Sequence, residues 1–497
     1  MNARPPRTTP RLRSATVVVL AALALLPAGC ALGPDYHPAL DHVAVPARFV
    51  SATPAVAASD PVVDDWWRLY NDDALNGLVL DALSANTDLR VASANLARAK
   101  AVLGEARDGL YTPSTQVGVN ATETRSSTTN LLASLAGTKP KAAAYDTASF
   151  TASYELDLFG RLRRGVEAAR ADADAARAAL DYARVSVAAE TATAYAEACA
   201  YGAAVASAQR SRDIARQTAE VTTTQRNLGA ASDFDVTRAA ALASQAAAAV
   251  PALEAQRRSV LFSLAVLTGR PAETVIPAAQ SCTRPPHLAA PPPVGDGAAL
   301  LRRRPDIREA ERQLAGDTAR IGVATASLFP VISLGGQITA GGVTPAKAVS
   351  YSGTSFSVGP GLTWNGPNIL AARERIRESN AVARATLARF DGVVLQAYRE
   401  AETTLATLDG VRQQNTALHA ARDQLRAAAA LAQSRYDEGA ASFLELLDAQ
   451  RSLQLAESDL AASDLRQSDA EIALFRALGG GWKSAPAVID RLPAPRP

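Results

Sequence analysis

The sequence has little of what catalytic and metal-binding sites need. Among 497 residues there are three cysteines, one methionine and four histidines. The histidines, His37, His42, His287 and His419, show no metal-ligand spacing. No nucleophile, base and orienting group occur in a recognisable arrangement, and no glycine-rich phosphate loop follows a predicted strand. We therefore expect no enzyme activity, no metal and no cofactor.

The sequence also has no large excess of positive or negative charge and contains few aromatic side chains. The 51 Lys and Arg nearly balance the 49 Asp and Glu, so the net charge of +2 suggests neither a nucleic acid nor an anionic surface as a partner. Aromatic residues make up 5% of the chain, whereas hydrophobic residues make up 48%. This composition is typical of long helices rather than of a compact enzyme core.

The sequence also lacks an apolar run long enough to cross a membrane as a helix. The uncharged apolar run at residues 15–26 has about 12 residues, against the roughly 20 that a spanning helix needs. Arginines precede it, so residues 1–29 are predicted to be a signal peptide that is removed. Pro27-Ala28-Gly29-Cys30 resembles a bacterial lipobox, with Pro27 where leucine is preferred. We expect Cys30 to become a lipidated, palmitate-bearing N-terminus; a plain leader with an incidental cysteine is the alternative.

Two further cysteines remain in the chain. Cys199 lies in an alanine-rich helical pattern and Cys282 in a proline-rich connector. Only these two thiols could pair after lipidation, and the sequence leaves their pairing open. For Cys199 a buried small hydrophobic residue is the favoured interpretation.

The sequence does contain two tandem copies of one unit. Gly229-Ala230-Ala231-Ser232 recurs as Gly439-Ala440-Ala441-Ser442, and the same offset of 210 residues pairs Glu190 with Glu400 and Gly269 with Gly479. Such a duplication predicts a quasi-symmetric assembly. The predicted segments are a signal peptide (1–29), a lipidated N-terminal segment (30–74), a first repeat (75–269), a Pro-rich connector (270–300), a second repeat (301–480) and a C-terminal tail (481–497).

Hydrophobic periodicity predicts the helices of each copy. Apolar residues at three- and four-residue steps predict one helix of about 35 residues from Leu75 towards Tyr111. Uninterrupted helical patterns predict rods at about 159–227 and 369–437, each roughly 100 Å long at 1.5 Å per residue. After each Gly-Ala-Ala-Ser turn a helix of about 36 residues returns. We hypothesise that the two shorter helices of a copy stack end to end beside its rod.

Between the first helix and the rod of each copy, the apolar period changes to two. The alternating apolar residues are Val117, Val119 and Ala121; Phe150, Ala152, Tyr154 and Leu156; Ile332, Leu334 and Ile338; and Phe356, Val358, Leu362 and Trp364. Each copy therefore carries one hairpin whose strands have one apolar and one polar face. Pro360 is expected at a bulge or where its strand bends into the next helix.

Such strands fit a membrane crossing, although a soluble surface sheet is the other interpretation. About ten residues suffice for a tilted strand to cross a bilayer. Four strands leave two open edges, which lipid does not tolerate, and about eight strands are needed even for a filled barrel. Three chains would supply twelve strands around a water-filled lumen. We predict a homotrimer in contact with outer-membrane lipid.

Five groups of residues carry a resemblance to a known family. They are Cys30 with Gly33-Pro34-Asp35-Tyr36, Trp66-Trp67 with Ala82-Leu83 and Asn86, the segment from Tyr154 to Arg161, Arg304-Pro305-Asp306-Ile307 with Ala310-Glu311, and the segment from Tyr436 to Gln450. Jointly they resemble the TolC-like outer-membrane factors, specifically the NodT and OprM-like lipoproteins of resistance-nodulation-division (RND) efflux pumps. The chain departs from the family at Pro27 and at Asn365-Gly366-Pro367-Asn368, which replaces a Phe- and Gly-rich turn.

The resemblance implies a mainly α fold with a membrane β part. A trimeric, lipid-anchored tunnel would combine a twelve-stranded transmembrane β-barrel in the bacterial outer membrane with a helical barrel in the periplasm. It would dock with a periplasmic adaptor (membrane fusion) protein and an inner-membrane RND-type transporter. The implied function is the passive exit of small molecules such as drugs and toxic compounds.

The two Gly-Ala-Ala-Ser turns are predicted to form the periplasmic tip. Gly229 and Gly439 fit helix C-caps, and Ser232 and Ser442 fit N-caps of the returning helices. The small side chains of both turns, Ala230, Ala231, Ala440 and Ala441 included, allow close approach by an adaptor, a contact that the resemblance favours. Simple turns between antiparallel helices are the alternative.

Acidic residues follow the turns. Glu445 and Asp448 lie three apart on one helical face, and Asp235 lies in the equivalent part of the first copy. The resemblance implies that these three residues form an acidic constriction, the periplasmic gate, where threefold repetition would concentrate negative charge in a narrow bore. A solvated helix surface is the other interpretation.

Two rival functions remain open from the sequence. A duct for protein or polysaccharide secretion would share this architecture. A non-conducting periplasmic structural lipoprotein would use the long helices as a tether, although it would not need bilayer-length alternating strands. Identifying the partner proteins would distinguish a secretion duct from an efflux duct. A conductance measurement would distinguish a non-conducting structural lipoprotein from a channel.

Overall fold

The computed structural model describes residues 31–39, 48–54, 57–125, 137, 142–274, 276–348, 350–364 and 369–489. The predicted signal peptide, Cys30, His42 and the Asn365-Gly366-Pro367-Asn368 segment lie outside these residues. The described residues divide into two compact units. The first unit lies within Met1–Pro38, Arg98–Asp174 and Arg312–Ala388, and the second within Ala39–Ala97, Ala175–Glu311 and Arg389–Pro497.

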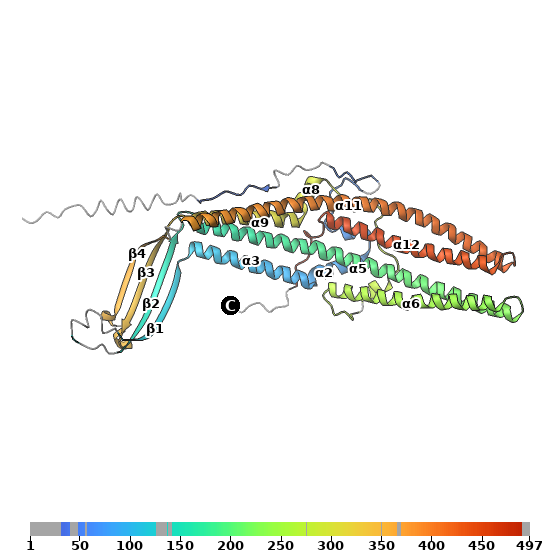
Figure 1. Ribbon diagram of the computed structural model, residues 1–497, viewed down its shortest axis with the longest axis horizontal. Helices are drawn as coiled ribbons and strands as arrows, with labels where there is room; N and C mark the ends of the chain where they lie inside the picture. The colour runs from blue at the N-terminus through green and yellow to red at the C-terminus, as the bar shows by residue number, and fades with distance from the viewer. Residues whose placement is uncertain are drawn as a thin grey trace, which may run out of the picture. The chain divides into compact units, whose positions relative to one another are not determined.

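The first unit contains an antiparallel sheet of four strands in the order β1-β2-β3-β4 (Figure 1). Its strands are β1 (Ser114–Thr124), β2 (Ala143–Leu156), β3 (Val331–Gly342) and β4 (Thr354–Thr363). The short α10 (Pro345–Ala348) and η4 (Tyr351–Gly353) lie between β3 and β4. Each copy therefore contributes one hairpin, as the period of two predicts, and the two hairpins pair through β2 and β3.

The prediction for Pro360 is wrong. It lies inside β4, opposite Leu334, and the pairing of β3 with β4 continues without a bulge on either side of it. In this chain β4 is the last strand of the sheet and pairs with β3 alone. Within one chain β4 is paired on one side only, so a proline whose missing N–H would face the other side removes no hydrogen bond from the β3–β4 ladder.

The predicted first helix is also divided. It forms α2 (Asp73–Ala85) and α3 (Thr87–Tyr111), with Asn86 between them. The Asn86 Oδ1 atom accepts hydrogen bonds from the N–H groups of Asp88 (2.8 Å) and Leu89 (3.2 Å). Such capping satisfies amide groups that begin a new helix. The apolar period of three and four residues continues across the break, which is why periodicity alone did not reveal it.

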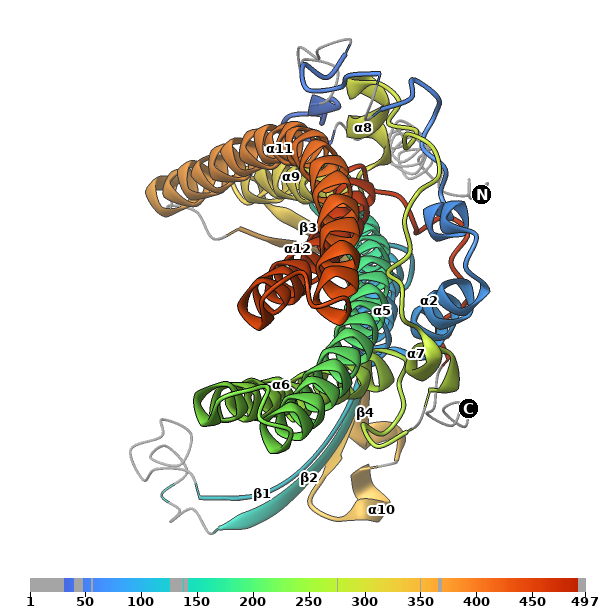
Figure 2. The same cartoon turned by 90° about the vertical axis from the view of Figure 1, so that its right-hand side faces the viewer.

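The long helices agree with the predicted rods and returning helices. They are α5 (Arg161–Asn227), α6 (Asp233–Leu267), α11 (Ile369–Asp437) and α12 (Phe443–Ala477). In the second unit α6 lies alongside α5 and α12 alongside α11 (Figure 2). Among the described residues, no helix is both long and apolar enough to cross a membrane.

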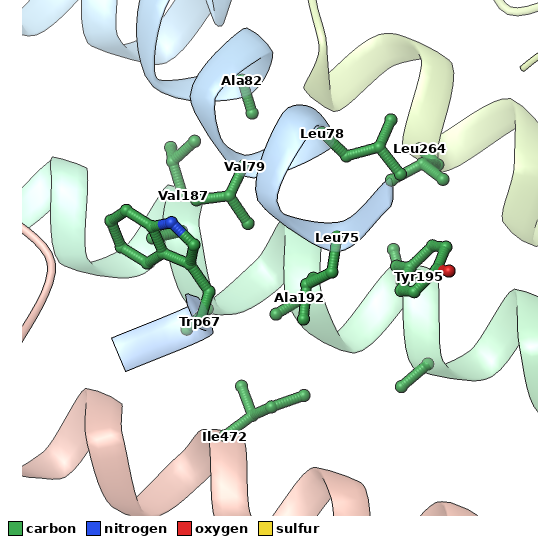
Figure 3. Packing of buried hydrophobic residues seen from close by; sticks show 14 of the residues in the cluster. Trp67, Leu75, Leu78, Val79, Ala82, Val187, Ala192, Tyr195, Leu264 and Ile472 are labelled. Carbon is green, nitrogen blue, oxygen red and sulfur yellow. The ribbon is translucent and has the colours of Figure 1, made fainter. Parts of the chain in front are cut away.

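The core of the second unit is built around η3 (Trp66–Tyr70), α2 and α5. Trp67, Leu75, Val79 and Val187 pack together, with Ile472 of α12 on the other side (Figure 3). Trp66 is fully buried and stacks on Phe475, with ring centroids 5.0 Å apart. The Trp-Trp pair therefore joins elements of both repeats in one apolar cluster.

End-to-end stacking of the shorter helices is confirmed at both junctions. Asn86 donates a hydrogen bond from Nδ2 to the carbonyl of Leu267, the last residue of α6 (3.1 Å). In the second copy α9 (Pro305–Ala326) follows α8 (Gly297–Arg303), and Arg304 between them donates to the carbonyl of Ala477 at the end of α12 (2.8 Å). A side chain at the start of one helix thus satisfies a terminal carbonyl of the other.

Cys199 is fully buried, as the favoured interpretation predicts, and the structure decides the pairing that the sequence left open. Cys199 of α5 forms a disulfide with Cys282, which follows α7 (Pro277–Ser281) in the connector. Gly202, one turn further along α5, makes room for the connector, because a Cβ atom there would lie 2.2 Å from the Cys282 carbonyl oxygen. The sequence could not reveal the pairing, because the two cysteines are separated by 83 positions that include a complete helical turn-around.

We expect the disulfide to stabilise the first helix pair. Replacing Cys282 by serine should lower the free energy of unfolding by about 2–4 kcal/mol, since the bond closes a long loop in the unfolded chain. Thermal unfolding of the purified protein with and without a dithiol reductant measures this loss. The control is Ser281→Ala, at the exposed neighbouring position. Equal loss of stability on reduction in wild type and Cys282→Ser would contradict the expectation.

Candidate functional site

The sheet carries two chemically different faces. Because directly paired residues of antiparallel strands point to the same side, the register places Val117, Phe150, Ile338 and Phe356 in one row. These side chains are exposed in the single chain, Val117 at 73% and Phe356 at 81%. The neighbouring row on the opposite face consists of polar residues: Gln116, Thr151, Gln337 and Ser357.

This division matches a sheet with lipid on one side and water on the other. An exposed apolar face of this size is unusual for a soluble protein. Strands of ten to fourteen residues are long enough for a tilted crossing of the hydrocarbon layer. The apolar row is therefore the candidate lipid surface and the polar row the candidate lumen surface.

The residues that follow Cys30 are held firmly in the first unit. Arg164, 4% exposed, donates hydrogen bonds to the carbonyl of Leu32 (3.1 Å) and to the Asp35 carboxylate (2.7 Å). Two glycines make the close approach possible. A Cβ atom on Gly160 would lie 2.6 Å from the Ala31 Cα atom, and one on Gly33 would lie 2.5 Å from the Gly322 Cα atom.

This clamp on residues 31–35 was not predicted. Gly33 and Asp35 belong to a motif that the sequence analysis singled out, but Arg164 is one of many arginines in a helical pattern. Nothing local distinguishes it, because its partners lie about 130 residues away. The predicted lipidation site Cys30 itself lies outside the described residues.

The two Gly-Ala-Ala-Ser segments form tight turns between long helices, as predicted. Gly229 (φ 76°) and Gly439 (φ 74°) take the left-handed conformation that ends a helix. Ser232 and Ser442 are N-caps, each accepting a hydrogen bond from the amide three residues later. In each turn two alanines lie between the glycine that ends one helix and the serine that caps the next, and Ala230 and Ala440 are exposed.

Two of the three predicted gate residues also stabilise their own helices. Glu445 accepts a hydrogen bond from the Ser442 N–H (3.0 Å), and Asp235 accepts one from the Ser232 N–H (3.1 Å), which completes a capping box in each copy. The hydrogen bonds from Ser232 hold the pKa of Asp235 below its usual value. Asp448 lies one turn further on and is exposed.

Different interactions stabilise the two turns at equivalent positions of the repeats. In the first copy Arg226 forms an ion pair with Asp233 (2.8 Å) across the turn. The residues 210 positions later are Tyr436 and Phe443, whose ring centroids lie 5.9 Å apart. Tyr436 also donates a hydrogen bond to the Gln225 Oε1 atom (2.8 Å), which connects the tip of α11 with that of α5. Sequence analysis did not identify this link, because its two residues lie 211 positions apart and Gln225 carries no local signal.

Comparison with known proteins agrees with this architecture. The family described as Outer membrane efflux protein matches residues 78–270 and 298–480. Nodulation protein T of Rhizobium leguminosarum bv. trifolii is 31% identical over 92% of this chain and 96% of its own length. The toluene efflux pump outer membrane protein TtgF of Pseudomonas putida is 31% identical over 93% and 96%. The solved structure of the outer-membrane channel OprN has 32% identity and a TM-score of 0.82, covering 91% of this chain and 100% of that one.

The sheet has one apolar and one polar face, and the long helices form hairpins that end in turns of small residues. These features define an outer-membrane channel protein with a periplasmic helical part. The chain belongs to the outer membrane efflux protein family, whose two matched segments each contain one hairpin of the sheet and one long helical turn-around.

Proposed function

We propose that three copies of this chain close into one passive duct, through which an efflux system releases small molecules across the outer membrane. The observation that carries the proposal is the open sheet. Within the described residues β1 pairs only with β2, and β4 only with β3, although the apolar face is exposed. Lipid does not tolerate open backbone edges. Pairing of β4 with β1 of the next copy removes both edges and remains antiparallel, since each copy has an even number of strands.

The duct would depend on partners for energy and for substrate delivery. We infer a periplasmic adaptor, which contacts the exposed tips at 229–232 and 439–442, and an inner-membrane RND-type transporter. The relatives named as a toluene efflux pump component and a pyoverdine export protein support efflux of small molecules. The family and fold are those of channel proteins. We infer accordingly that the chain catalyses no reaction.

The N-terminal part of the proposal concerns anchoring. We infer removal of residues 1–29, lipidation of Cys30, and repeats at 75–269 and 301–480 on either side of the connector 270–300. The clamp on residues 31–35 supports a lipid anchor at Cys30, because Arg164 and Gly160 hold the chain next to it against the end of β2 and the start of α5.

The gate is proposed to combine acidic charge with the tyrosine link. Glu445 and Asp448 of each copy would add negative charge to the bore, and Asp235 would contribute from the first repeat. The Tyr436–Gln225 hydrogen bond would hold the two tips of one copy together. Both effects belong to the ends of the hairpins, where Ala230, Ala440 and Asp448 are exposed.

The test is the conductance of the purified protein in planar bilayers. The variant Glu445→Gln with Asp448→Asn removes six charges per trimer but keeps a hydrogen-bonding side chain at the capping position. We expect lower cation selectivity, because the attraction of the carboxylates for cations disappears. We also expect a higher single-channel conductance, because cations no longer bind tightly between the carboxylates and obstruct the narrow bore.

Two further variants make this result specific. Glu438→Gln removes an exposed charge just before the second turn, and we expect it to leave selectivity unchanged. Tyr436→Phe keeps every charge and removes the link to Gln225, so it should raise conductance without altering selectivity. Unchanged conductance in both the acidic variant and Tyr436→Phe would reject the gate. A protein that forms no pores at all would reject the duct.

A further inference from the structure

The connector between the repeats is attached to both helical hairpins of the second unit. It runs from α7 to α8 (Figure 2), and the disulfide between Cys199 of α5 and Cys282 fixes its first half. Arg257 of α6 donates hydrogen bonds to the carbonyl groups of Gln280 and Cys282, the latter at 3.2 Å. A covalent bond and hydrogen bonds together therefore hold this part of the connector on the first hairpin, α5 with α6.

The next part of the connector is held by α12 instead. The Leu288 N–H donates a hydrogen bond to the carboxylate of Glu471 (3.0 Å), which is fully buried. The Ser468 hydroxyl donates to the Pro286 carbonyl oxygen (2.6 Å). The residues 282–288, which we call the strap, thus extend from a covalent attachment on α5 to a hydrogen-bonded attachment on α12.

The duplication shows that the strap is not a part of the repeat's own packing. Gly202 of α5 lies 210 positions before Arg412 of α11. At Gly202 a Cβ atom would lie 2.2 Å from the Cys282 carbonyl oxygen, so the first copy has no side chain where the strap is attached. Arg412 instead forms an ion pair with Glu471 (3.0 Å), the residue that binds the other end of the strap. The two copies differ at equivalent positions, each in a way that fits the strap.

The two sulfur atoms of the disulfide differ in their access to solvent. Cys199 is fully buried and belongs to the apolar cluster around η3, α2 and α5. Cys282 is only partly buried, and its neighbours Ser281 and Thr283 are exposed. A thiolate in solution can therefore reach the sulfur of Cys282 in the folded protein, but not that of Cys199.

We propose that the disulfide is a redox latch, which a dithiol reductant opens by thiolate attack on the Cys282 sulfur, so that the strap loses its covalent attachment to α5. The attacking sulfur bonds to Cys282 Sγ, and Cys199 Sγ leaves with the electron pair and takes up a proton. The second thiol of the reductant then attacks the mixed disulfide and gives its proton to the departing Cys282 sulfur. Two electrons and two protons pass from the dithiol, which becomes a disulfide, to the protein. An oxidised dithiol closes the latch by the reverse steps.

The burial of Cys199 favours a dithiol over a monothiol as the reductant. A thiol in apolar surroundings is a poor leaving group, because its thiolate is poorly solvated there. Arg257 still holds the strap near α5 after the first step, so Cys199 stays close to the mixed disulfide and can re-form the original bond. This reversal expels a monothiol, whereas a dithiol completes the reduction by forming its own disulfide.

Opening of the latch should loosen one end of the strap and not the other. Without the disulfide, only the hydrogen bonds of Arg257 remain of the contacts described for the first hairpin, and the contacts with α12 are unaffected. After treatment with dithiothreitol, the amides of α7 and Cys282 should exchange hydrogen at least about tenfold faster, because no covalent bond opposes local opening. The Leu288 amide, bound to α12, should exchange at an unchanged rate.

The chemical step is tested by trapping the mixed disulfide. Cys199→Ala keeps a small buried side chain and leaves Cys282 without its partner. After incubation with oxidised glutathione in detergent, this variant should carry one glutathione on Cys282, which peptide mass spectrometry locates. Cys282→Ser is the matched variant, and its buried Cys199 should be modified only after unfolding in denaturant. In the wild type, dithiothreitol should reduce the disulfide at least about tenfold faster than reduced glutathione at the same total thiol concentration.

Three results would overturn the proposal. They are equal modification of the two folded variants, equally fast reduction of the wild type by glutathione and dithiothreitol, and an unchanged rate of amide exchange around Cys282 in the reduced wild type. The last two measurements use the wild type alone, so they decide the matter even where Cys199→Ala does not fold. None of the three depends on pore formation, so failure here is separate from failure of the proposed duct.

Discussion

An arginine in place of Ile338 should abolish stable insertion of this protein into membranes. Ile338 lies in the apolar row between Phe150 and Phe356, in the middle part of β3, with 53% of its surface exposed. Arginine on the lipid face near the centre of a bilayer costs about 2–4 kcal/mol per site. A trimer contains the site three times. We expect almost no folded trimer in the outer-membrane fraction and none after refolding into lipid vesicles.

The adjacent residue provides the matched control. Gln337 points to the opposite, polar face, in the row with Thr151 and Ser357. Gln337→Arg adds the same charge to the same strand, but to the water-filled side, so we expect normal insertion and a change only in ion selectivity. Normal amounts of inserted Ile338→Arg trimer would show that this row does not face lipid.

Replacing Arg304 by methionine should destabilise the second unit strongly. Arg304 is 3% exposed and donates hydrogen bonds to the carboxylates of Asp306 and Glu400 and to the Ala477 carbonyl. Methionine fills similar space but leaves these acceptors without their donor. The two carboxylates left behind are partly exposed, so we expect a loss of about 2–3 kcal/mol, as for removal of hydrogen bonds to charged groups. Denaturant unfolding of the purified protein, followed by helix circular dichroism, measures the loss.

Two further variants distinguish the loss of the Arg304 hydrogen bonds from the general effect of removing an arginine. Arg302→Met, on the exposed side of α8, should change stability by less than about 0.5 kcal/mol. Adding Glu400→Gln to Arg304→Met should recover part of the loss, because the carboxylate no longer remains without its partner. Equal effects of Arg304→Met and Arg302→Met would mean that the hydrogen bonds at this junction contribute little.

Most elements were predictable because their patterns are long. A period of two over ten or more residues identified four strands, and helical patterns of about 70 residues identified α5 and α11 with nearly their observed ends. The turn chemistry was equally local. Glycine after a helix and serine before the next one specify the caps at 229–232 and 439–442, whatever the rest of the chain does.

The predictions that failed, and the cysteine pairing that stayed open, depend on contacts between distant parts of the chain or on a strand's place in the sheet. Asn86 divides the first helix because it caps α3 and also contacts the end of α6, about 180 residues later. Cys199 is paired because the connector returns to α5 after the first helical turn-around. Pro360 lies inside β4, where the pairing with β3 continues on both sides of it. No local pattern contains this information.

In the candidate site, too, local features could be predicted from the sequence and long-range contacts could not. The sequence identified the acidic residues and the small-residue turns, and the resemblance implied their roles as gate and tip. The three-residue spacing of Ser232 and Asp235, and of Ser442 and Glu445, is itself a local signal for a capping box, which the sequence analysis did not use. The Tyr436–Gln225 link and the Arg164 clamp both join residues more than 100 positions apart.

By itself, the amino-acid sequence determined the duplication, the type and length of the main elements, and the apolar and polar faces of the strands, since each depends on spacing along the chain. Only the tertiary structure decided which ends meet and which side chains pair: the junctions at Asn86 and Arg304, the disulfide, and the register that aligns Val117, Phe150, Ile338 and Phe356 in one row. These contacts depend on distances in space, and residues far apart in the sequence leave no periodic signal when they meet.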